Sequence, residues 1–261
     1  MDTQGIERAA AILRESRRIV ALTGAGISRP SGIPDFRGEG GLWRLADPMA
    51  VASLRGFQAD PRRFYAWFRP LLDVFAAARP NPAHLALARL ERAGHLRAVI
   101  TQNIDGLHQS AGSREVYELH GHMRSATCVE CDRQAPARPL IERARRGEIP
   151  RCSCGGAFKP DIVLFDEMLP RGLYWLALHA LDSCDTLIVA GTSLEVAPVC
   201  ELPLPALRRG ARLIVVNQEP TYLDDRAEVV LREDVAEALP AIVDLSSQLP
   251  VVSSKTLTVG L

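Results

Sequence analysis

The sequence predicts an α/β protein built on a doubly wound parallel sheet, with a small zinc-binding module inserted in it. Near-continuous apolar runs, typical of buried parallel strands, alternate with segments whose apolar residues recur at helical spacing. Five of these runs end in glycine-rich or polar turns, and ligands bind at such strand ends in sheets of this kind. Four cysteines at metal-ligand spacing interrupt the alternation.

The apolar runs and the capping residues place the individual elements. Strands are expected at residues 18–23, 97–101, 116–119, 162–165, 186–190 and 212–216, and helices at 6–16, 60–78, 82–93, 173–181 and 234–245. Asp60 before Pro61, and Asn81 before Pro82, each put an N-cap in front of a proline at the first helical position. Gly94 ends the third helix. The segment from about 123 to 160 shows little hydrophobic periodicity.

Length and charge exclude several classes of protein. A chain of 261 residues suits one large domain, or a core domain with an insertion. Lys+Arg and Asp+Glu are both 31, so strong attraction to nucleic acid or anionic membranes is not expected. No apolar run reaches the ~18 residues of a membrane span, and the first residues lack the pattern of a secretory signal. We expect a cytoplasmic monomer without nucleic-acid or membrane partners.

The first apolar run leads into a glycine-rich turn at residues 24–38. Gly24 and Gly26 would let the backbone approach a phosphate, which free N–H groups could bind. The turn departs from the dinucleotide-binding pattern G-x-G-x-x-G because Arg29 stands where the third glycine would be. A tight strand-to-helix turn without a ligand is the alternative. The acid, aromatic and base at 35–37 favour binding, since such a loop is costly to order alone.

Polar residues also follow the later apolar runs. They are Gln102, Asn103, Ile104 and Asp105, then His120, then Gly191, Thr192 and Ser193, and finally Asn217, Gln218 and Glu219. Because parallel strands end at one edge of a sheet, these turns should line one site. His120 is a candidate general base, since imidazole takes up a proton near neutrality; a satisfied core histidine is the alternative. We expect Gly121 to interrupt the strand and so to separate His120 from His122.

The four cysteines predict a structural zinc site. Cys128 and Cys131 form a pair with the usual two-residue gap, and Cys152 and Cys154 form a tighter pair about twenty residues later. Two such pairs can bring four thiolates to one tetrahedral ion. A site with four cysteines has no open position, so this zinc would fold the module without taking part in catalysis. Four unrelated thiols are the alternative.

The motifs together resemble the sirtuin (Sir2) family of NAD-dependent protein deacylases, of the bacterial type. The resemblance rests on GAGISRPSGIPDFRG (24–38), TQNIDGLHQSAG (101–112), ELHGHM (118–123), the four cysteines, KPDIVLFDE (159–167), GTSLEVAPV (191–199) and VVNQEP (215–220). It implies a Rossmann-like NAD domain over 1–122 and 161–245, a zinc module over 123–160, and a C-terminal tail over 246–261. Its substrates would be acyl-lysine proteins or peptides, most simply acetylated ones.

The resemblance also implies roles for individual residues. His120 would be the base and Asn103 a second catalytic residue. NAD would contact Gly24, Ala25, Gly26, Ser28, Asp35, Phe36, Arg37, Gln102, Asn103, Ile104, Asp105, Gly191, Thr192, Ser193, Asn217, Gln218, Glu219 and Val235. The acylated peptide would contact Tyr65, Phe68, Val163, Phe165, Asp166, Glu167, Glu195 and Val196. The products would be nicotinamide, free lysine and O-acyl-ADP-ribose.

Two departures from the family pattern bear on the substrate. Members that remove succinyl groups have Tyr and Arg three residues apart, whereas here Tyr65 is followed by Phe68, with Arg69 one step further. One step is about 100° around a helix, so Arg69 should point elsewhere. Asp166 replaces a common Gly where the backbone pairs with the peptide.

Three other functions remain open at this point. An ADP-ribosyltransferase or NAD glycohydrolase would use the same pocket, and a non-catalytic reader of modified peptides would lack the base. An NAD dehydrogenase would favour the complete glycine pattern.

Overall fold

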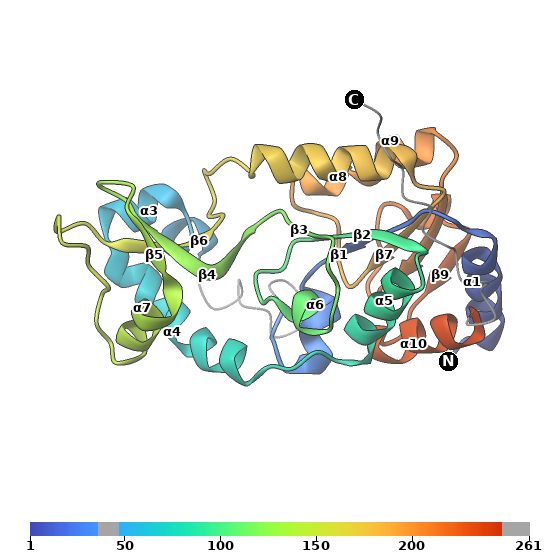
Figure 1. Cartoon of the computed structure of the whole chain (residues 1–261), viewed down its shortest axis with the longest axis horizontal. Coiled ribbons are helices and arrows are strands. Elements are labelled where there is room, and N and C mark those ends of the chain that lie inside the picture. The colour runs from blue at the N-terminus through green and yellow to red at the C-terminus, as the bar shows by residue number, and fades with distance from the viewer. Residues whose placement is uncertain (36–46, 247–261) are drawn as a thin grey trace, which may run out of the picture.

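A six-stranded parallel sheet forms the centre of the larger of two lobes (Figure 1). The computed structural model describes residues 1–35 and 47–246. The strands of this sheet are β1 (Ile19–Thr23), β2 (Leu96–Thr101), β3 (Val116–Glu118), β7 (Thr186–Ala190), β8 (Arg212–Val216) and β9 (Val229–Leu231). Their lateral order is β3-β2-β1-β7-β8-β9 and every neighbouring pair is parallel. The chain therefore reverses its direction of winding between β1 and β7, which is the ligand-binding point of a Rossmann-like sheet.

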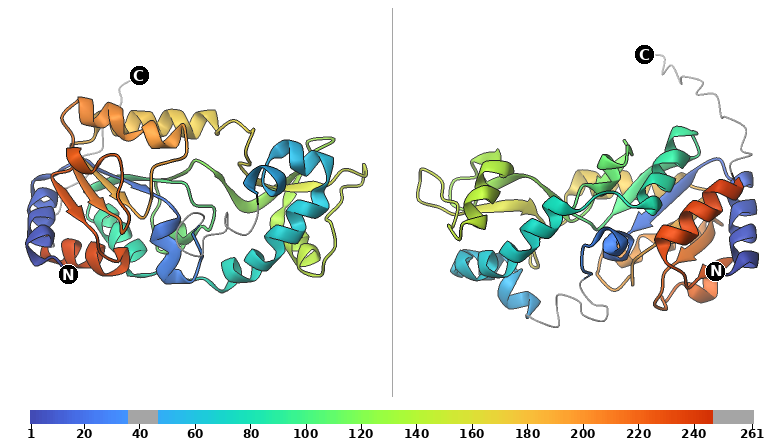
Figure 2. Two further views of the ribbon diagram at one scale, coloured as in Figure 1. Left: turned by 180° about the vertical axis from the view of Figure 1, so that it is seen from behind. Right: turned by 90° about the horizontal axis from the view of Figure 1, so that it is seen from below.

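Helices cover both faces of this sheet (Figure 2). α1 (Thr3–Glu15), α5 (Pro82–Arg92) and α10 (Val235–Ser246) pack on one face, and α8 (Arg171–Ser183) and α9 (Pro203–Arg208) pack on the other. Alternate residues of β1 point to opposite faces of the sheet. Ile19 and Ala21 pack in the apolar cluster under α1, α5 and α10, and Val20 and Leu22 pack in the cluster under α8 and α9. The predicted doubly wound fold is confirmed.

The smaller lobe contains a three-stranded antiparallel sheet of order β5-β4-β6. Its elements are β4 (Gly121–Cys128), β5 (Gln134–Pro136), β6 (Phe158–Ile162) and α7 (Ala137–Arg145). α2 (Pro48–Val51), α3 (Leu54–Ala59) and α4 (Pro61–Ala77) belong to the same lobe (Figure 1). Phe64 and Phe68 of α4 share one apolar cluster with Ala144 and Ile162. The core of this lobe therefore combines residues from inside and outside the range 123–160.

Short helices complete the described chain. They are α6 (Leu107–Ser110) and the 3-10 helices η1 (Ala25–Ser31), η3 (Val199–Glu201) and η4 (Asp224–Arg226). Within residues 1–35 and 47–246, no helix combines the length and the apolar character that crossing a bilayer requires.

Several predicted elements match closely. β7 and β8 have the predicted bounds, and α4 and α5 begin after the predicted caps, with the side chains of Asp60 and Asn81 accepting from Arg62 N and Ala83 N. Gly94, with φ of 84°, follows α5 in the left-handed conformation expected at a helix end. The predicted tail begins at Ser246, the last residue of α10; residues 247–261 lie outside the described range.

The strand predicted at 162–165 is wrong. Strand β6 ends at Ile162 and belongs to the small sheet, and the next residues form a loop. Val163 N donates to His120 O, and Phe165 N donates to Ala52 O, so hydrogen bonds hold the loop on two sides. An apolar run that lines a cavity in this way resembles a core strand in sequence.

The expected interruption at Gly121 is also wrong in part, because β4 starts there. Gly121 has φ of 77°, and a Cβ on it would lie 2.1 Å from Asp161 O, so only glycine fits. The glycine therefore marks where the chain leaves one sheet and enters the other. The sequence patterns also missed the short strands β5 and β9 and the helix α7.

Candidate active site between the two lobes

A cavity of about 1370 Å³ lies between the carboxyl edge of the large sheet and the small lobe. The turns after β1, β2, β7 and β8 line it from one side. α4 and residues 162–169 line it from the other. The polar strand ends predicted to form one site therefore do come together.

Two glycine turns meet where the sheet reverses its winding. Gly26 N donates to Gly191 O at 2.8 Å, and a Cβ on Gly26 would lie 2.8 Å from Gly191 Cα. A Cβ on Gly24 would lie 2.7 Å from Thr192 Cβ. The glycines after β1 are thus required by the close approach of the turn after β7. Ala25 and Ser193 line the cavity beside them.

Ser28, Asn103 and Asp105 form a buried hydrogen-bond network on the cavity wall. Ser28 Oγ donates to Asp105 Oδ2 at 2.7 Å, and Asn103 Nδ2 donates to Gly24 O and Ser28 Oγ, both at 3.1 Å. Burial raises the pKa of Asp105, and hydrogen bonds from Leu107 N and Ser28 oppose this shift. These bonds hold the carboxylate of Asp105 and the amide of Asn103 in fixed positions.

Two buried histidines support this network from behind. His108 Nε2 lies 2.9 Å from Thr23 Oγ1, and His84 Nε2 lies 3.5 Å from Ser28 Oγ. His84 Nδ1 accepts from Asn81 N. Their rings pack edge to face with centroids 4.9 Å apart. Neither lines the cavity, so both histidines act from behind its wall.

The remaining predicted NAD contacts follow one another along the cavity. Gln102 Nε2 donates to Thr192 Oγ1 at 2.8 Å, and Asn217 Nδ2 donates to Glu219 O at 2.7 Å. Ile104, Asp35, Gln218 and Val235 also line it. Arg29, which the prediction omitted, does so too, and its guanidinium lies near Gln218 Oε1 (3.3 Å) and Asp35 Oδ2 (3.5 Å). Phe36 and Arg37 lie outside the described residues.

His120 lies at the junction of β3 and β4 and lines the cavity. Burial lowers the pKa of its imidazole to about 4, although a hydrogen bond with the backbone of Gln102 raises it in part. The ring is therefore neutral at pH 7 and able to accept a proton. His122 does not line the cavity, and its Nδ1 accepts from Arg124 N at 3.4 Å. The structure thus distinguishes the two histidines.

Most of the predicted peptide contacts also lie on the cavity wall: Phe68, Val163, Phe165, Asp166, Glu167, Glu195 and Val196. Asp166 has φ of 70°, a conformation that glycine adopts without strain, and it pairs with the exposed Arg55 at 3.1 Å. Tyr65 does not line this cavity. Its hydroxyl donates to Phe158 O at 2.6 Å, so the structure places it in the core of the small lobe instead.

The end of the cavity next to α4 is apolar. Trp67, Leu71, Val74 and Phe75 line it together with Phe68. Sequence reasoning missed these four residues, although their spacing along one helix face could have indicated them. Arg69 does not line the cavity, and its guanidinium lies close to Gly147 of the small lobe. The expectation that Arg69 points elsewhere is confirmed.

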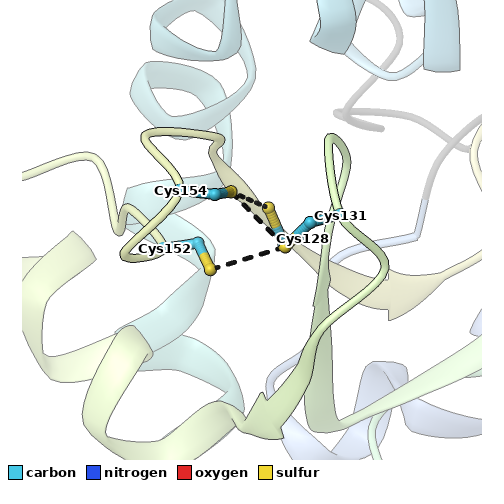
Figure 3. Close-up of side chains that lie close together, drawn as sticks. All are labelled: Cys128, Cys131, Cys152 and Cys154. Atoms are coloured by element: carbon cyan, nitrogen blue, oxygen red, sulfur yellow. Dashed lines mark hydrogen bonds between the residues drawn. The ribbon is translucent and has the colours of Figure 1, made fainter.

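The four cysteines converge at one point of the small lobe (Figure 3). Their Sγ atoms all lie within 4.8 Å of one another, with 3.5 Å between Cys128 and Cys154 and 3.7 Å between Cys131 and Cys152. Thiolates bound tetrahedrally at about 2.3 Å from zinc are separated by about 3.8 Å, so the cluster fits this ion. A Cβ on Gly156 would lie 2.6 Å from Cys128 Sγ, which explains the glycine.

Comparison with known proteins agrees with this arrangement. Residues 24–198 match the model of the Sir2 family. A curated relative from Archaeoglobus fulgidus, "NAD-dependent protein deacylase 2", is 48% identical over 92% of this chain and 95% of its own. One from Caldivirga maquilingensis, "NAD-dependent protein deacetylase", is 46% identical over 92% and 93%. Both are archaeal, so they do not support the finer resemblance to bacterial members.

Solved structures give the same result. One described as "Structural Basis for the Mechanism and Regulation of Sir2 Enzymes" has a TM-score of 0.89 and 46% identity, covering 95% of this chain and 99% of its own. A Sir2 protein bound to a myristoylated histone peptide has a TM-score of 0.82 and 41% identity, covering 94% and 98%. A Sir2 mutant with a deacetylated p53 peptide and 3'-O-acetyl ADP-ribose has a TM-score of 0.87 and 39% identity, covering 92% and 97%. The chain belongs to the Sir2 family.

Proposed function

We propose that this protein is an NAD-dependent protein-lysine deacylase. The observation that carries the proposal is the position of His120, a neutral imidazole on a cavity with two different ends. The glycine turns and the polar network form one end, and the apolar face of α4 forms the other. A nucleotide and an acyl chain could therefore meet beside one base.

NAD supplies the ribose that receives the acyl group, with release of nicotinamide. Its phosphates would lie against the turns at Gly24–Gly26 and Gly191–Ser193, because these turns follow β1 and β7, on either side of the point where the sheet reverses its winding. Asp105 would accept from the carboxamide of nicotinamide, and Asn103 would orient its neighbours. Asn217 and Glu219 would bind the ribose of the adenosine, and Val235 would contact the adenine.

His120 would remove a proton from a ribose hydroxyl. A base for this step must be neutral at the working pH and must face the reacting groups. The lowered pKa of His120 meets the first condition and its place on the cavity wall meets the second. The other buried histidines, His84, His95 and His108, do not line the cavity.

The acyl group would be acetyl or a longer uncharged chain. Among the described residues, Arg29 and Arg171 are the only cations on the cavity wall, and neither belongs to α4. A terminal carboxylate would therefore lack a partner at the apolar end, which costs several kcal/mol. The relative that binds a myristoylated peptide supports a long chain.

A panel of acyl-lysine peptides, incubated with and without NAD and analysed by mass spectrometry, tests this proposal. Acetyl- or long-chain peptides should react at least about 100-fold better in kcat/KM than succinyl peptides. Phe68→Arg should recover part of the succinyl activity, and Arg69→Ala, outside the cavity, is the matched control. Equal rates on succinyl and acetyl peptides would contradict the assignment of the apolar end.

An ADP-ribosyltransferase or NAD glycohydrolase would use the same pocket and is the second candidate. Its products differ, since no acyl-ADP-ribose forms. We further propose that the protein acts as a monomer in the cytoplasm. A reducing compartment suits a site of four thiolates, which an oxidising one would convert to disulfides.

A further inference from the structure

Lys159 on β6 carries an ammonium group that is almost enclosed by protein. Its side chain is 11% exposed, and Nζ donates to Ile162 O at 2.8 Å, to Glu167 Oε2 at 2.9 Å and to Pro160 O at 3.3 Å. It does not line the cavity. A buried ammonium is tolerated only where it is paired and hydrogen-bonded, and Lys159 meets both conditions within one short stretch of chain.

Glu167, the partner of Lys159, is bound to the same stretch. Its Oε2 also accepts from Leu164 N at 2.8 Å, and its own N–H donates to Leu164 O at 3.1 Å. The ion pair is therefore hydrogen-bonded to the backbone at Ile162 and at Leu164, on either side of Val163. The carboxylate of Glu167 is committed to these contacts, although the residue itself lies on the cavity wall.

Residues 162–164, which the ion pair holds, connect His120 to the side of the cavity that would bind the peptide. Val163 N donates to His120 O at 2.8 Å. Phe165 is hydrogen-bonded to the neighbouring α2–α3 turn through its N–H, to Ala52 O, and through its carbonyl, from Leu54 N. Val163, Leu164 and Phe165 all line the cavity. Residues 162–167 thus form a hydrogen-bonded segment of the cavity wall that is attached to His120 through Val163.

We propose that Lys159 and Glu167 are positioning residues that hold residues 162–167 in the shape that binds the acyl-lysine peptide. The inference rests on the proposed deacylase function and assigns Glu167 a structural task rather than a direct contact with the peptide. An apolar side chain at 159 could fill the same space, but it could not bind Ile162 O and Glu167 together. The pair acts on peptide binding, since its hydrogen bonds go to residues 160–164 and not to the glycine turns that would bind NAD.

The test compares three variants with the unmodified protein, using an acyl-lysine peptide that the unmodified protein turns over. Lys159→Met removes the cation, Lys159→Arg keeps it, and Glu167→Gln keeps an acceptor for Leu164 N without the charge. Glu148→Gln, which removes exposed ion pairs with Arg143 and Arg146 in the same lobe, is the control. The KM values for peptide and for NAD, kcat, and thermal unfolding are measured for each.

Lys159→Met should raise the KM for the peptide about tenfold or more, the order expected for loss of a charged hydrogen bond, and leave the KM for NAD unchanged. Glu167→Gln should do the same to a smaller extent, Lys159→Arg should restore peptide binding, and the control should change nothing. If Lys159→Met does not fold, Glu167→Gln decides the matter. An unchanged peptide KM, or an equal rise in both KM values, would overturn the proposal.

Direct peptide binding separates this inference from the proposed function. Fluorescence anisotropy of a labelled acyl-lysine peptide does not depend on turnover. Failure of the unmodified protein to bind or deacylate any acyl-lysine peptide would reject the deacylase function itself. Normal binding by the unmodified protein and by both Lys159→Met and Glu167→Gln would reject the positioning role alone.

Discussion

The large sheet and the small lobe differ in what holds them together. The sheet buries both of its faces under helices, and β1, β7 and β8 consist almost entirely of buried apolar residues. The small sheet has three strands, and one of its clusters consists of Cys128, Cys152, Ala126 and Phe158. The rest of its core depends on α4. The comparison indicates that the large lobe is stable through its own core, whereas the small lobe needs its metal and the packing of α4 against its sheet.

The largest effect should come from removing zinc. Because all four ligands are protein thiolates, chelation should unfold the small lobe and abolish deacylation. ADP-ribose binding, which we assign to the large lobe, should persist. Metal analysis should find one zinc per chain, and circular dichroism with calorimetric ADP-ribose titration would follow the two lobes separately. Full activity in a metal-free, cooperatively folded protein would show that the lobes do not differ in this way.

The next largest effect should come from His120, at the junction of the two lobes. His120→Ala should lower deacylation by at least about 10²-fold, the usual contribution of a general base. Binding of NAD should survive, because the glycine turns are unchanged. His122→Ala, a neighbour outside the cavity, should have little effect. Near-normal turnover in His120→Ala would remove it from this role.

A smaller effect, confined to the nucleotide side, is expected for Asp105. A charged hydrogen bond to the carboxamide contributes roughly 1.5–3 kcal/mol, so Asp105→Asn should weaken NAD use by about 10- to 150-fold. Inhibition by nicotinamide should weaken in parallel. Steady-state kinetics with NAD and with peptide varied separately measure this. A change in the peptide KM alone would assign Asp105 to the other side of the cavity.

The smallest effect concerns pH and the buried histidines of the large lobe. Burial lowers the pKa of His84 to about 4 and that of His108 well below its usual 6.5. Between these pKa values the unfolded chain therefore binds more protons than the folded chain. The free energy of unfolding is greatest above pH 6.5 and declines towards pH 4. Each histidine contributes a slope that rises from about 0.7 kcal/mol per pH unit at pH 6.5 towards a limit of about 1.4 at lower pH.

Urea unfolding between pH 6.5 and 5.5 measures that slope. His84→Gln should reduce the slope of unfolding free energy against pH by the contribution of one histidine. His179→Gln, at an exposed site on α8, should leave the slope unchanged. An unchanged slope in His84→Gln would mean that this imidazole is not held neutral by burial.

The two lobes also differ in how far the sequence predicts them. Apolar runs and capping residues located β7, β8 and the starts of α4 and α5, because each depends on local pattern and burial. The polar strand ends predicted the site, since topology alone brings them to one edge. Within residues 123–160 of the small lobe, only the cysteines were informative. There β4 pairs antiparallel with β5 and β6, with a register shift between Gly121 and Ala126, and strands this short and irregular leave no periodic signal.

Two site predictions show where local pattern is insufficient. Tyr65 and Phe68 lie on neighbouring sides of α4, yet one binds Phe158 O and the other lines the cavity. That choice depends on where the small sheet packs against the helix. The run 162–165 lines the cavity instead of forming a core strand, and its hydrogen bonds go to His120 and Ala52. In both cases, contacts between segments that are distant in the sequence determine the position of the side chain or loop.

A product balance tests the central claim, that one cavity brings NAD and an acyl-lysine peptide to His120. The protein is incubated with NAD and an acetyl- or long-chain acyl-lysine peptide, and all products are quantified by mass spectrometry. Equal amounts of nicotinamide, deacylated peptide and O-acyl-ADP-ribose are expected, and all three should be lost together in His120→Ala. Nicotinamide with free ADP-ribose and intact peptide, or a peptide carrying ADP-ribose, would contradict the account.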